Sequence, residues 1–268
     1  MKDKVIIITG GSSGIGKAMA EAFGKNGSKI FITGRNLTDL HQAIAYLKTK
    51  GIDAHGFQAD VSIEDDNRKM FSEAMQKFGR VDILINNAGI TMRALFQEVD
   101  MKVIKKVMDI NFFGVLYATQ ACLPEIIKNK GSIIGISSIA GYRGLPGRTG
   151  YSASKFALIG FLESLRTELL NTGVHVLTAC PGFTASNTRK RALNSNGNEQ
   201  GESPRDESSM MSAEECAERI YNATVKRQKI LVMTNQGKLT VLLNKISSAW
   251  MDRIVYNTMA KEPDSPFR

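Results

Sequence analysis

The amino-acid sequence predicts a doubly wound α/β fold, in which helices cover both faces of a parallel sheet. Short runs of β-branched and aliphatic residues alternate with longer amphipathic stretches over most of the chain. The strand runs are apolar throughout, so both of their faces must be covered. The chain has 268 residues, 43% of them hydrophobic and 23% charged, which is enough to bury a sizeable core and excludes a disordered, collagen-like or coiled-coil protein.

The strands are expected in order along the chain. The first is Val5-Ile6-Ile7-Ile8 and the second is Lys29-Ile30-Phe31-Ile32-Thr33, each a β-branched run that ends in a turn. Further strands are expected at residues 54–58, 83–85, 132–136, 175–179 and 230–232. Stretches with helical periodicity lie between them, each long enough to cross back over a sheet, at residues 15–25, 37–50, 64–78, 101–128, 151–170 and 213–225.

Charge and cysteine content exclude several classes of function. Lys and Arg number 35 against 26 Asp and Glu, a net charge of +9, and this surplus is spread along the chain, which argues against nucleic-acid binding. Cys122, Cys180 and Cys216 lie far apart without a nearby His, so we expect no disulfide, no metal and a reducing, cytoplasmic location. The apolar run after Met1 is too short for a signal peptide, and no run reaches the ~18 apolar residues of a membrane span.

A glycine-rich turn follows the first strand and opens the first helix. It reads Thr9-Gly10-Gly11-Ser12-Ser13-Gly14-Ile15-Gly16. Glycines at this spacing let the backbone turn sharply and approach a pyrophosphate, which then lies at the positive end of the helix. The motif predicts dinucleotide binding by Gly10, Ser12, Ser13, Gly14, Ile15 and Gly16, because no Lys-Ser or Lys-Thr pair follows as in a nucleoside-triphosphate loop. The alternative is a tight turn without a ligand.

The ends of the second and third strands supply the next candidates. Arg35 follows the second strand, where an arginine complements the 2′-phosphate of NADP and an acidic residue would bind the ribose of NAD. Arg35 therefore favours NADP(H) over NAD(H), although it could also be a solvated turn residue. Asp60, beside Val61 after the third strand, could accept a hydrogen bond from the adenine amino group or cap the helix that begins near Glu64.

Tyr151 and Lys155 are four residues apart in a helical stretch, so their side chains share one face. We expect the Lys155 ammonium to lower the pKa of the Tyr151 phenol and make it a proton donor and acceptor near neutral pH. Ser138 lies just after a strand end, where its hydroxyl could hold a substrate oxygen. Together these residues predict acid–base chemistry at a substrate oxygen.

Taken together, the motifs resemble the short-chain dehydrogenase/reductase family, which has a Rossmann fold. The resemblance covers residues 4 to 233 and rests on the glycine motif, Asn86-Asn87-Ala88-Gly89, Asn111, Ser137-Ser138-Ile139-Ala140-Gly141, Tyr151-Ser152-Ala153-Ser154-Lys155 and Pro181-Gly182. It implies that Ser138 polarises the substrate carbonyl, that Tyr151 is the acid/base, and that Lys155 binds the nicotinamide ribose while lowering the pKa of Tyr151.

The resemblance also implies roles for residues around this set. Asn111 resembles the asparagine that holds a water in the proton relay, whereas Asn87 borders the cofactor or is simply structural. After Pro181 and Gly182 the chain departs from the family pattern, because Thr184 replaces an aliphatic residue and Ser186 replaces a threonine. Which of these two hydroxyls meets the cofactor stays open. Branches of the family resembling this sequence include animal dehydrogenase/reductases and 3-ketosphinganine reductases, whose N-terminal anchor we expect to be missing here.

The domain organisation follows from a composition break late in the chain. We expect one catalytic domain at residues 1–233, including a mobile loop at 184–212, and a C-terminal helical extension at 234–268. Residues 194–209 hold no aliphatic or aromatic side chain, so they form either a lid over a site or a surface insertion. Residues 238–259 place an apolar stripe at helical spacing, which packs on the domain or on a second subunit in preference to a membrane surface.

The function predicted is an NADP(H)-dependent oxidoreductase, most simply a ketone reductase acting on a small-molecule carbonyl. Apolar residues in loops after strands suggest a partly apolar substrate, namely Met92, Leu95, Phe96, Leu145, Phe183, Met210 and Met211. The resemblance implies a homodimer or homotetramer built on the helices that hold Asn111 and Tyr151. Two alternatives remain, a dinucleotide-binding regulator without turnover and a membrane-surface keto-lipid reductase.

Overall fold

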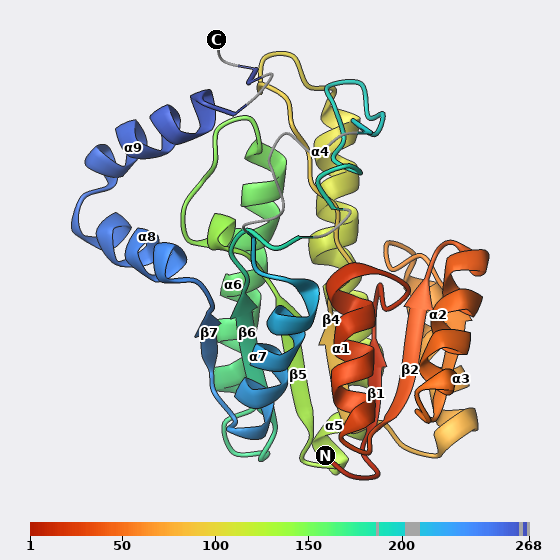
Figure 1. Ribbon diagram of the computed structural model, residues 1–268. Coiled ribbons are helices and arrows are strands. Elements are labelled where there is room, and N and C mark those ends of the chain that lie inside the picture. The colour runs from red at the N-terminus through yellow and green to blue at the C-terminus, as the bar shows by residue number, and fades with distance from the viewer. Residues whose placement is uncertain (186–187, 202–209, 263–264, 267–268) are drawn as a thin grey trace.

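The structure confirms the doubly wound α/β fold. The computed structural model describes residues 1–185, 188–201, 210–262 and 265–266, and within them seven strands form one sheet in the order β3-β2-β1-β4-β5-β6-β7. All neighbouring strands are parallel. The strands lie between two layers of helices (Figure 1) and are β1 (Val5–Ile8), β2 (Lys29–Gly34), β3 (Ala54–Gln58), β4 (Ile83–Asn86), β5 (Ser132–Ile136), β6 (His175–Cys180) and β7 (Ile230–Val232).

The strand order reverses at β1, which pairs with β2 on one side and β4 on the other. The turns that follow β1 and β4 therefore diverge at the carboxyl end of the sheet and leave a crevice between them, the usual ligand position in such folds. The backbone joins the two turns directly, since Thr9 N–H donates to the Ile85 carbonyl at 3.0 Å. The predicted glycine motif lies in one of these turns and Asn87 in the other.

Alternate residues of each strand enter separate cores on the two faces of the sheet. In β1, Ile6 and Ile8 join one apolar cluster and Ile7 joins the other, as the period of two in a strand requires. The first cluster is closed by α1 (Gly14–Lys25), α2 (Leu37–Thr49) and α7 (Ala213–Val225). The second is closed by α3 (Glu64–Phe78), α5 (Gly114–Lys128) and α6 (Thr149–Glu168).

The helix predicted at residues 101–128 is present but interrupted. It consists of α4 (Met101–Met108), one π-helical turn at Asp109–Phe113, and α5. Residues Met101–Lys128 are long and apolar enough to span a membrane by length and composition, but half of the apolar window is buried inside the protein, as expected for a core helix. The π turn includes Asn111, and such turns often mark functional sites.

The C-terminal stretch forms two helices where the sequence showed one continuous stripe. They are α8 (Asn235–Ile246) and α9 (Ser248–Ala260), which meet at Ser247 in an extended conformation with φ −151° and ψ 102°. The Ser247 hydroxyl accepts a hydrogen bond from Trp250 N–H and so caps the second helix. Both helices project from the side of the domain next to β7 (Figure 1).

The α8–α9 pair, residues 235–260, is fastened to the domain by a few polar contacts. Arg143 bonds the side chains of Asn244 and Asp252. Beyond α9, the buried Glu262 carboxylate lies 3.4 Å from the Arg148 guanidinium and 3.7 Å from that of Arg93. The position of α9 therefore depends on ion pairs at both of its ends.

Candidate active site

A cavity of about 480 Å³ opens at the carboxyl end of the sheet, in the crevice described above. It runs from the turn after β2, past the glycine motif, to the inner side of α9. All but two of the site residues predicted from the sequence line it, namely Gly10, Ser12, Ser13, Gly14, Ile15, Gly16, Arg35, Asp60, Val61, Asn87, Ser138, Tyr151, Lys155, Pro181, Gly182 and Thr184. Of the other two, Asn111 lies behind the cavity wall and Ser186 lies outside the described residues.

The glycine motif forms a backbone cradle that side chains would fill. Gly10 and Gly14 have φ of 65° and 52°, a region that favours glycine. A Cβ added at Gly16 would lie 2.3 Å from the Gly10 carbonyl oxygen and 2.5 Å from the Asn87 amide nitrogen, so this position requires glycine as well. Asn87 fixes the turn by donating its side-chain amide to the carbonyls of Thr9 and Gly10 at 2.9 and 3.1 Å.

The N-terminus of α1 suits a phosphate. Its first turn contains no acidic residue, and the side chain of the N-cap residue, Ser13, caps no backbone N–H. The N–H groups of this twelve-residue helix therefore point toward the cavity without a carboxylate in front of them. Together with the glycine cradle, this geometry fits the pyrophosphate of a dinucleotide.

Beyond the cradle, the cavity reaches the ends of β2 and β3. A Cβ added at Gly34 would meet the Ser12 hydroxyl at 2.7 Å, so the two turns are in contact there. Arg35 is exposed and its guanidinium has no side-chain partner among the described residues. Asp60 lines the cavity and uses one carboxylate oxygen to accept from the Ser62 N–H and hydroxyl at 2.9 and 2.6 Å. This contact lies in the turn before α3 and does not cap that helix, whose N-cap residue is Ile63, so the expected capping role is wrong.

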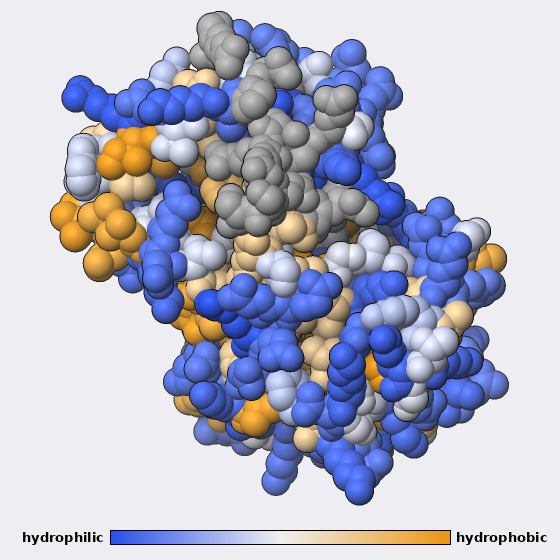
Figure 2. Space-filling model, in the orientation of Figure 1, coloured by the Kyte–Doolittle hydropathy of each residue, from blue (hydrophilic) through white to orange (hydrophobic). Residues whose placement is uncertain are grey.

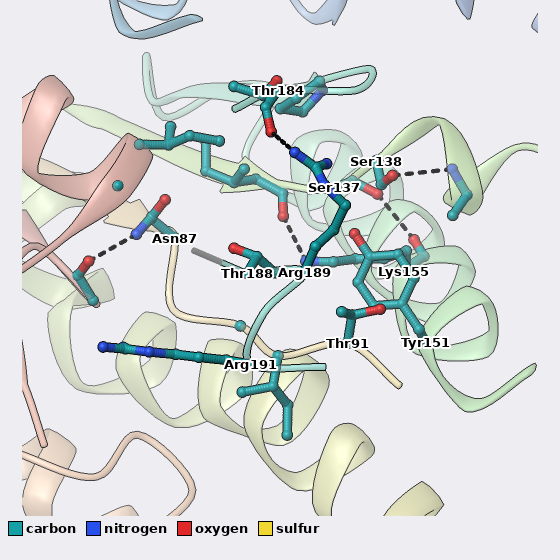
Figure 3. A pocket seen from close by; sticks show the side chains of 18 of the residues that line it. Asn87, Thr91, Ser137, Ser138, Tyr151, Lys155, Thr184, Thr188, Arg189 and Arg191 are labelled. Atoms are coloured by element: carbon teal, nitrogen blue, oxygen red, sulfur yellow. Dashed lines mark hydrogen bonds between the residues drawn. The ribbon is translucent and has the colours of Figure 1, made fainter. Parts of the chain in front are cut away.

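Ser138, Tyr151 and Lys155 come together at the far end of the cavity, between β5 and α6 (Figure 3). Ser138 caps a short 3₁₀ turn, Ile139–Gly141, by accepting a hydrogen bond from Ala140 N–H at 3.1 Å. The Lys155 ammonium donates to the Ile136 carbonyl at 2.8 Å and lies 5.7 Å from the centre of the Tyr151 ring. The strand end and the helix thus hold all three groups on one wall.

Burial dominates the electrostatics of this wall. It raises the pKa of Tyr151, while the hydrogen bond with Ser138 and the positive charge of Arg148 act in the opposite direction. Burial also lowers the pKa of Lys155 to about 8. The pKa of Tyr151 is therefore raised overall, and not lowered as expected, because burial of the phenol outweighs the groups that favour the phenolate. The contribution of Lys155 itself stays a prediction.

Asn111 is fully buried and its side chain is held by protein groups. The amide oxygen accepts from Ile90 N–H at 2.8 Å, and the amide nitrogen donates to the Ile90 carbonyl and the Ser154 hydroxyl, each at 2.9 Å. The side chain therefore joins the turn after β4 to α6 and uses both of its N–H donors, whereas the amide oxygen can accept a second hydrogen bond, and the expected role with a water stays a prediction. It positions the segment that carries Gly89, where an added Cβ would lie 3.6 Å from the Lys155 ammonium.

The turn after β6 brings Pro181, Gly182 and Thr184 to the cavity. The Thr184 hydroxyl donates to the Gly182 carbonyl at 3.3 Å, and the Thr184 carbonyl accepts from the Arg189 guanidinium at 2.8 Å. Because Ser186 lies outside the described residues, the choice between these two hydroxyls as cofactor contacts stays a prediction.

Comparison with known proteins agrees with this geometry. The family model described as short chain dehydrogenase matches residues 4–197. Dehydrogenase/reductase SDR family member 7B of Mus musculus is 31% identical over 271 residues, covering 99% of this chain and 84% of that protein. This chain belongs to the short-chain dehydrogenase/reductase family. It is therefore an oxidoreductase that acts on CH–OH groups.

Solved structures of this family share the fold. A short chain dehydrogenase/reductase of Burkholderia phymatum in complex with NAD superposes with a TM-score of 0.83 at 23% identity and covers 93% of this chain and 95% of its own. An actinorhodin polyketide ketoreductase variant with NADPH has a TM-score of 0.68 at 30% identity and covers 69% of this chain and 74% of its own.

Several cavity residues of this family member were missed by sequence reasoning. They are basic residues of three separate loops or helices, and the inner faces of α8 and α9: Lys106, Arg148, Arg189, Arg191, Thr234, Gly237, Met251, Ile254, Val255 and Met259. Arg189 and Arg191 closely follow Pro181-Gly182 in the sequence, which is a usable signal. The apolar stripe at residues 238–259 did not indicate that α9 also turns apolar side chains toward the cavity, as Met251, Val255 and Met259 do.

The apolar residues expected around the substrate are only partly correct. Leu145 and Phe183 line the cavity. Met92 is fully buried in a small core with Val103 and Leu193, and Phe96 points to solvent with 64% of its surface exposed. Met211 packs on the first core, and Leu95 and Met210 do not line the cavity. The position of an apolar residue in a loop after a strand did not show whether its side chain packs in a core or lines the cavity.

Proposed function

We propose that this enzyme reduces a ketone to a secondary alcohol with NADPH, on a substrate with an apolar body. The observation that supports the proposal is the convergence of Ser138, Tyr151 and Lys155 in one cavity with the glycine cradle. Such a cavity can hold the carbonyl between the acid group and the hydride donor. The nicotinamide, when bound, supplies the hydride.

The residues of this chain supply the proton and the orientation. The Ser138 hydroxyl donates a hydrogen bond to the carbonyl oxygen and fixes its direction. As the hydride forms the new C–H bond, the Tyr151 phenol transfers its proton to the same oxygen, which completes the alcohol. The raised pKa of Tyr151 keeps the phenol protonated at neutral pH, which suits reduction better than oxidation. The Lys155 ammonium opposes the negative charge left on the phenol.

The preference for NADP(H) rests on Arg35. Its exposed guanidinium lies at the end of β2, the position that meets the adenosine ribose in this fold. Solved complexes of similar proteins contain NADPH in one case and NAD in another, so the preference must be argued from the residues of this chain. We expect wild type to bind NADPH at least 10-fold more tightly than NADH, and Arg35→Asp to reverse that order. Equal affinity of wild type for both cofactors would refute the argument.

A measurement of NADPH consumption distinguishes the proposed enzyme from a dinucleotide-binding regulator without turnover. We expect NADPH consumption with a panel of apolar ketones, and a loss of about 10³-fold or more in kcat for Tyr151→Phe with NADPH affinity retained. A regulator would bind NADPH and consume none in either form. The apolar character of the panel follows from α9, whose Met251, Ile254, Val255 and Met259 line the cavity opposite the polar wall.

The membrane-surface alternative is favoured by one specific observation. Large apolar side chains on α8 and α9 face solvent, including Ile246 at 73% and Trp250 at 55% exposure, together with Leu239 and Leu242. Figure 2 shows hydrophobic residues gathered on that side of the molecule. Lys238 and Lys245 lie on the same helix, whereas Asp252 is paired with Arg143. We expected the domain to cover the apolar stripe of residues 238–259. It covers the residues that face the cavity, whereas the outer residues of α8 and α9 are exposed.

Co-sedimentation with vesicles tests this alternative. If the α8–α9 surface meets lipid, wild type will pellet with vesicles that contain anionic lipid, and the double variant Leu242→Ser, Trp250→Ser will stay in the supernatant. Leu170→Ser, which removes a comparably exposed leucine at the end of α6, serves as the control. Wild type that stays in the supernatant would favour the cytoplasmic location that we propose, which is supported by three free cysteines, all buried.

A further inference from the structure

The loop after β6 reaches across the crevice to the first turn of α2. An Arg191 guanidinium nitrogen lies 3.9 Å from an Asp39 carboxylate oxygen, and both residues line the cavity. Asp39 follows Arg35 by one helical turn, and its N–H donates to the Asn36 side chain that caps α2. The Arg191 charge therefore lies at the same end of the cavity as Arg35, although the two are far apart in sequence.

Arg191 is held in this position by an ordered backbone. The residues on both sides of it take part in main-chain hydrogen bonds, from Gln200 N–H to the Ala192 carbonyl at 2.9 Å and from Gly201 N–H to the Lys190 carbonyl at 2.8 Å. Two residues further on, Leu193 is buried in a small core and exchanges backbone hydrogen bonds with residues 91 and 93. This part of the loop is thus anchored to the domain.

The side chain points away from the catalytic wall. Figure 3 shows the Arg191 guanidinium extending to the side of the pocket on which Asn87 lies, and away from Tyr151. Arg189, two residues earlier, turns instead toward the Thr184 carbonyl. The two arginines of this loop therefore serve different ends of the cavity.

The ion pair between Arg191 and Asp39 is weak, so Arg191 can leave Asp39 for a partner that binds it more strongly. Its side chains are 51% and 37% exposed and the closest N–O distance is 3.9 Å, so the pair is loose and solvated. A guanidinium binds a phosphate dianion through charge-assisted, often bidentate hydrogen bonds that a single distant carboxylate does not match. A phosphate at the end of β2 would meet Arg35 from the sheet side and Arg191 from the loop side.

We propose that Arg191 is a second specificity residue for the 2′-phosphate of NADP(H), leaving Asp39 for the phosphate when the cofactor binds. This inference rests on the proposed NADP(H) preference and adds a group to it from a distant loop. With Arg35 alone the phosphate would keep one solvated side next to the Asp39 carboxylate. With Arg191 moved from Asp39 to the phosphate, the phosphate is enclosed between two guanidinium groups, whose attraction outweighs the repulsion by the Asp39 carboxylate.

The test compares binding of NADPH and NADH, and of the fragments 2′,5′-ADP and 5′-AMP, by titration calorimetry without turnover. Arg191→Ala is expected to weaken NADPH and 2′,5′-ADP roughly 10-fold and to change NADH and 5′-AMP less than about 2-fold. Lys190→Ala removes the same charge from the neighbouring position, which does not line the cavity, and is expected to change none of them. Asp39→Asn breaks the pair from its other side and is expected to leave NADPH affinity unchanged or higher.

Three results would overturn the inference. Equal losses of affinity for NADPH and NADH in Arg191→Ala would show that the arginine binds a part that both cofactors share. An equal loss of NADPH affinity in Lys190→Ala would show that any positive charge in this loop has the same effect. Weakening of NADPH by Asp39→Asn to the level of Arg191→Ala would make the ion pair structural. A wild type without preference for 2′,5′-ADP over 5′-AMP would instead refute the NADP(H) proposal itself, and the role of Arg191 with it.

Discussion

At the residue scale, we propose that the protonation of Lys155 limits the reaction at high pH. Its ammonium is buried and its pKa is lowered to about 8, so the charge is present below that pH and is lost above it. Tyr151 has a raised pKa and stays protonated well beyond that point. Of the two groups, the lysine therefore changes its charge first as the pH rises.

We expect the reductase kcat/KM for NADPH, which reports the free enzyme, to be level below about pH 8 and to fall as pH rises through that value. The fall follows from loss of the Lys155 ammonium, since the proton donor itself is still in place. A rate profile between pH 6 and 10 measures it, with NADPH affinity followed in parallel. A profile that stays level to pH 10 would contradict the assignment.

The convergence of Ser138, Tyr151 and Lys155 on one cavity could be predicted because the relations of these residues are local. Tyr151 and Lys155 are four residues apart on one helix, and Ser138 follows a recognisable strand. Arg191 and Arg148 could not be placed in this way, since their positions depend on which distant loops meet over the crevice. The net direction of the Tyr151 pKa shift was mispredicted because the helical spacing of Lys155 does not reveal that both groups are buried.

At the scale of elements, the turn between β1 and α1 shows how tightly one position can be fixed. We expect Gly16→Ala to weaken NADPH and NADH alike, by roughly 100-fold, because the new Cβ would lie 2.3 Å from the Gly10 carbonyl oxygen and must push the cradle open. Titration with both cofactors measures the effect. Gly144→Ala is the control, because its Cβ would meet no described atom within 4 Å. Retained affinity in Gly16→Ala would show that the cradle does not contact the cofactor.

Strands and most helices were predicted to within a residue or two, because their apolar periods are long and regular. The interruptions were not predicted. The π turn at Asp109–Phe113 lies inside a continuous apolar helix pattern, and its cause is tertiary, namely the contacts of Asn111 with Ile90 and Ser154. The break at Ser247 was missed because serine fits both a helix interior and a cap, and the apolar spacing continues across it.

At the scale of the whole molecule, the π turn before α5 and helix α6 leave an aromatic surface uncovered in the single chain. Phe113 and Phe156 are 41% and 46% exposed, and Phe113 is in edge contact with Phe112, which in turn contacts Phe161. Such a patch on neighbouring helices suits a symmetric contact with a second copy. We propose that the enzyme is a homodimer through this surface.

Light scattering on a sizing column tests the homodimer. Wild type is expected to have twice the 29.4 kDa mass of the chain, and Phe156→Glu is expected to be a monomer at micromolar concentration. Phe96→Glu places the same charge at an exposed phenylalanine outside α5 and α6 and should leave the mass unchanged. A dimeric Phe156→Glu variant would place the contact elsewhere.

The wall that α9 contributes to the cavity lies outside residues 4–197, the part of the chain that matches the family model. In the proposed mechanism, the residues for proton transfer and nucleotide recognition thus lie mostly before residue 198, whereas one side of the proposed ketone site lies after residue 234. That late segment is joined to the domain partly through the contacts of Arg143 and Arg148, which a graft must keep. Replacing the segment after residue 234 with that of a relative should therefore transfer the relative's preference among ketones. The kcat and KM for a small ketone that does not reach α9 should stay nearly unchanged.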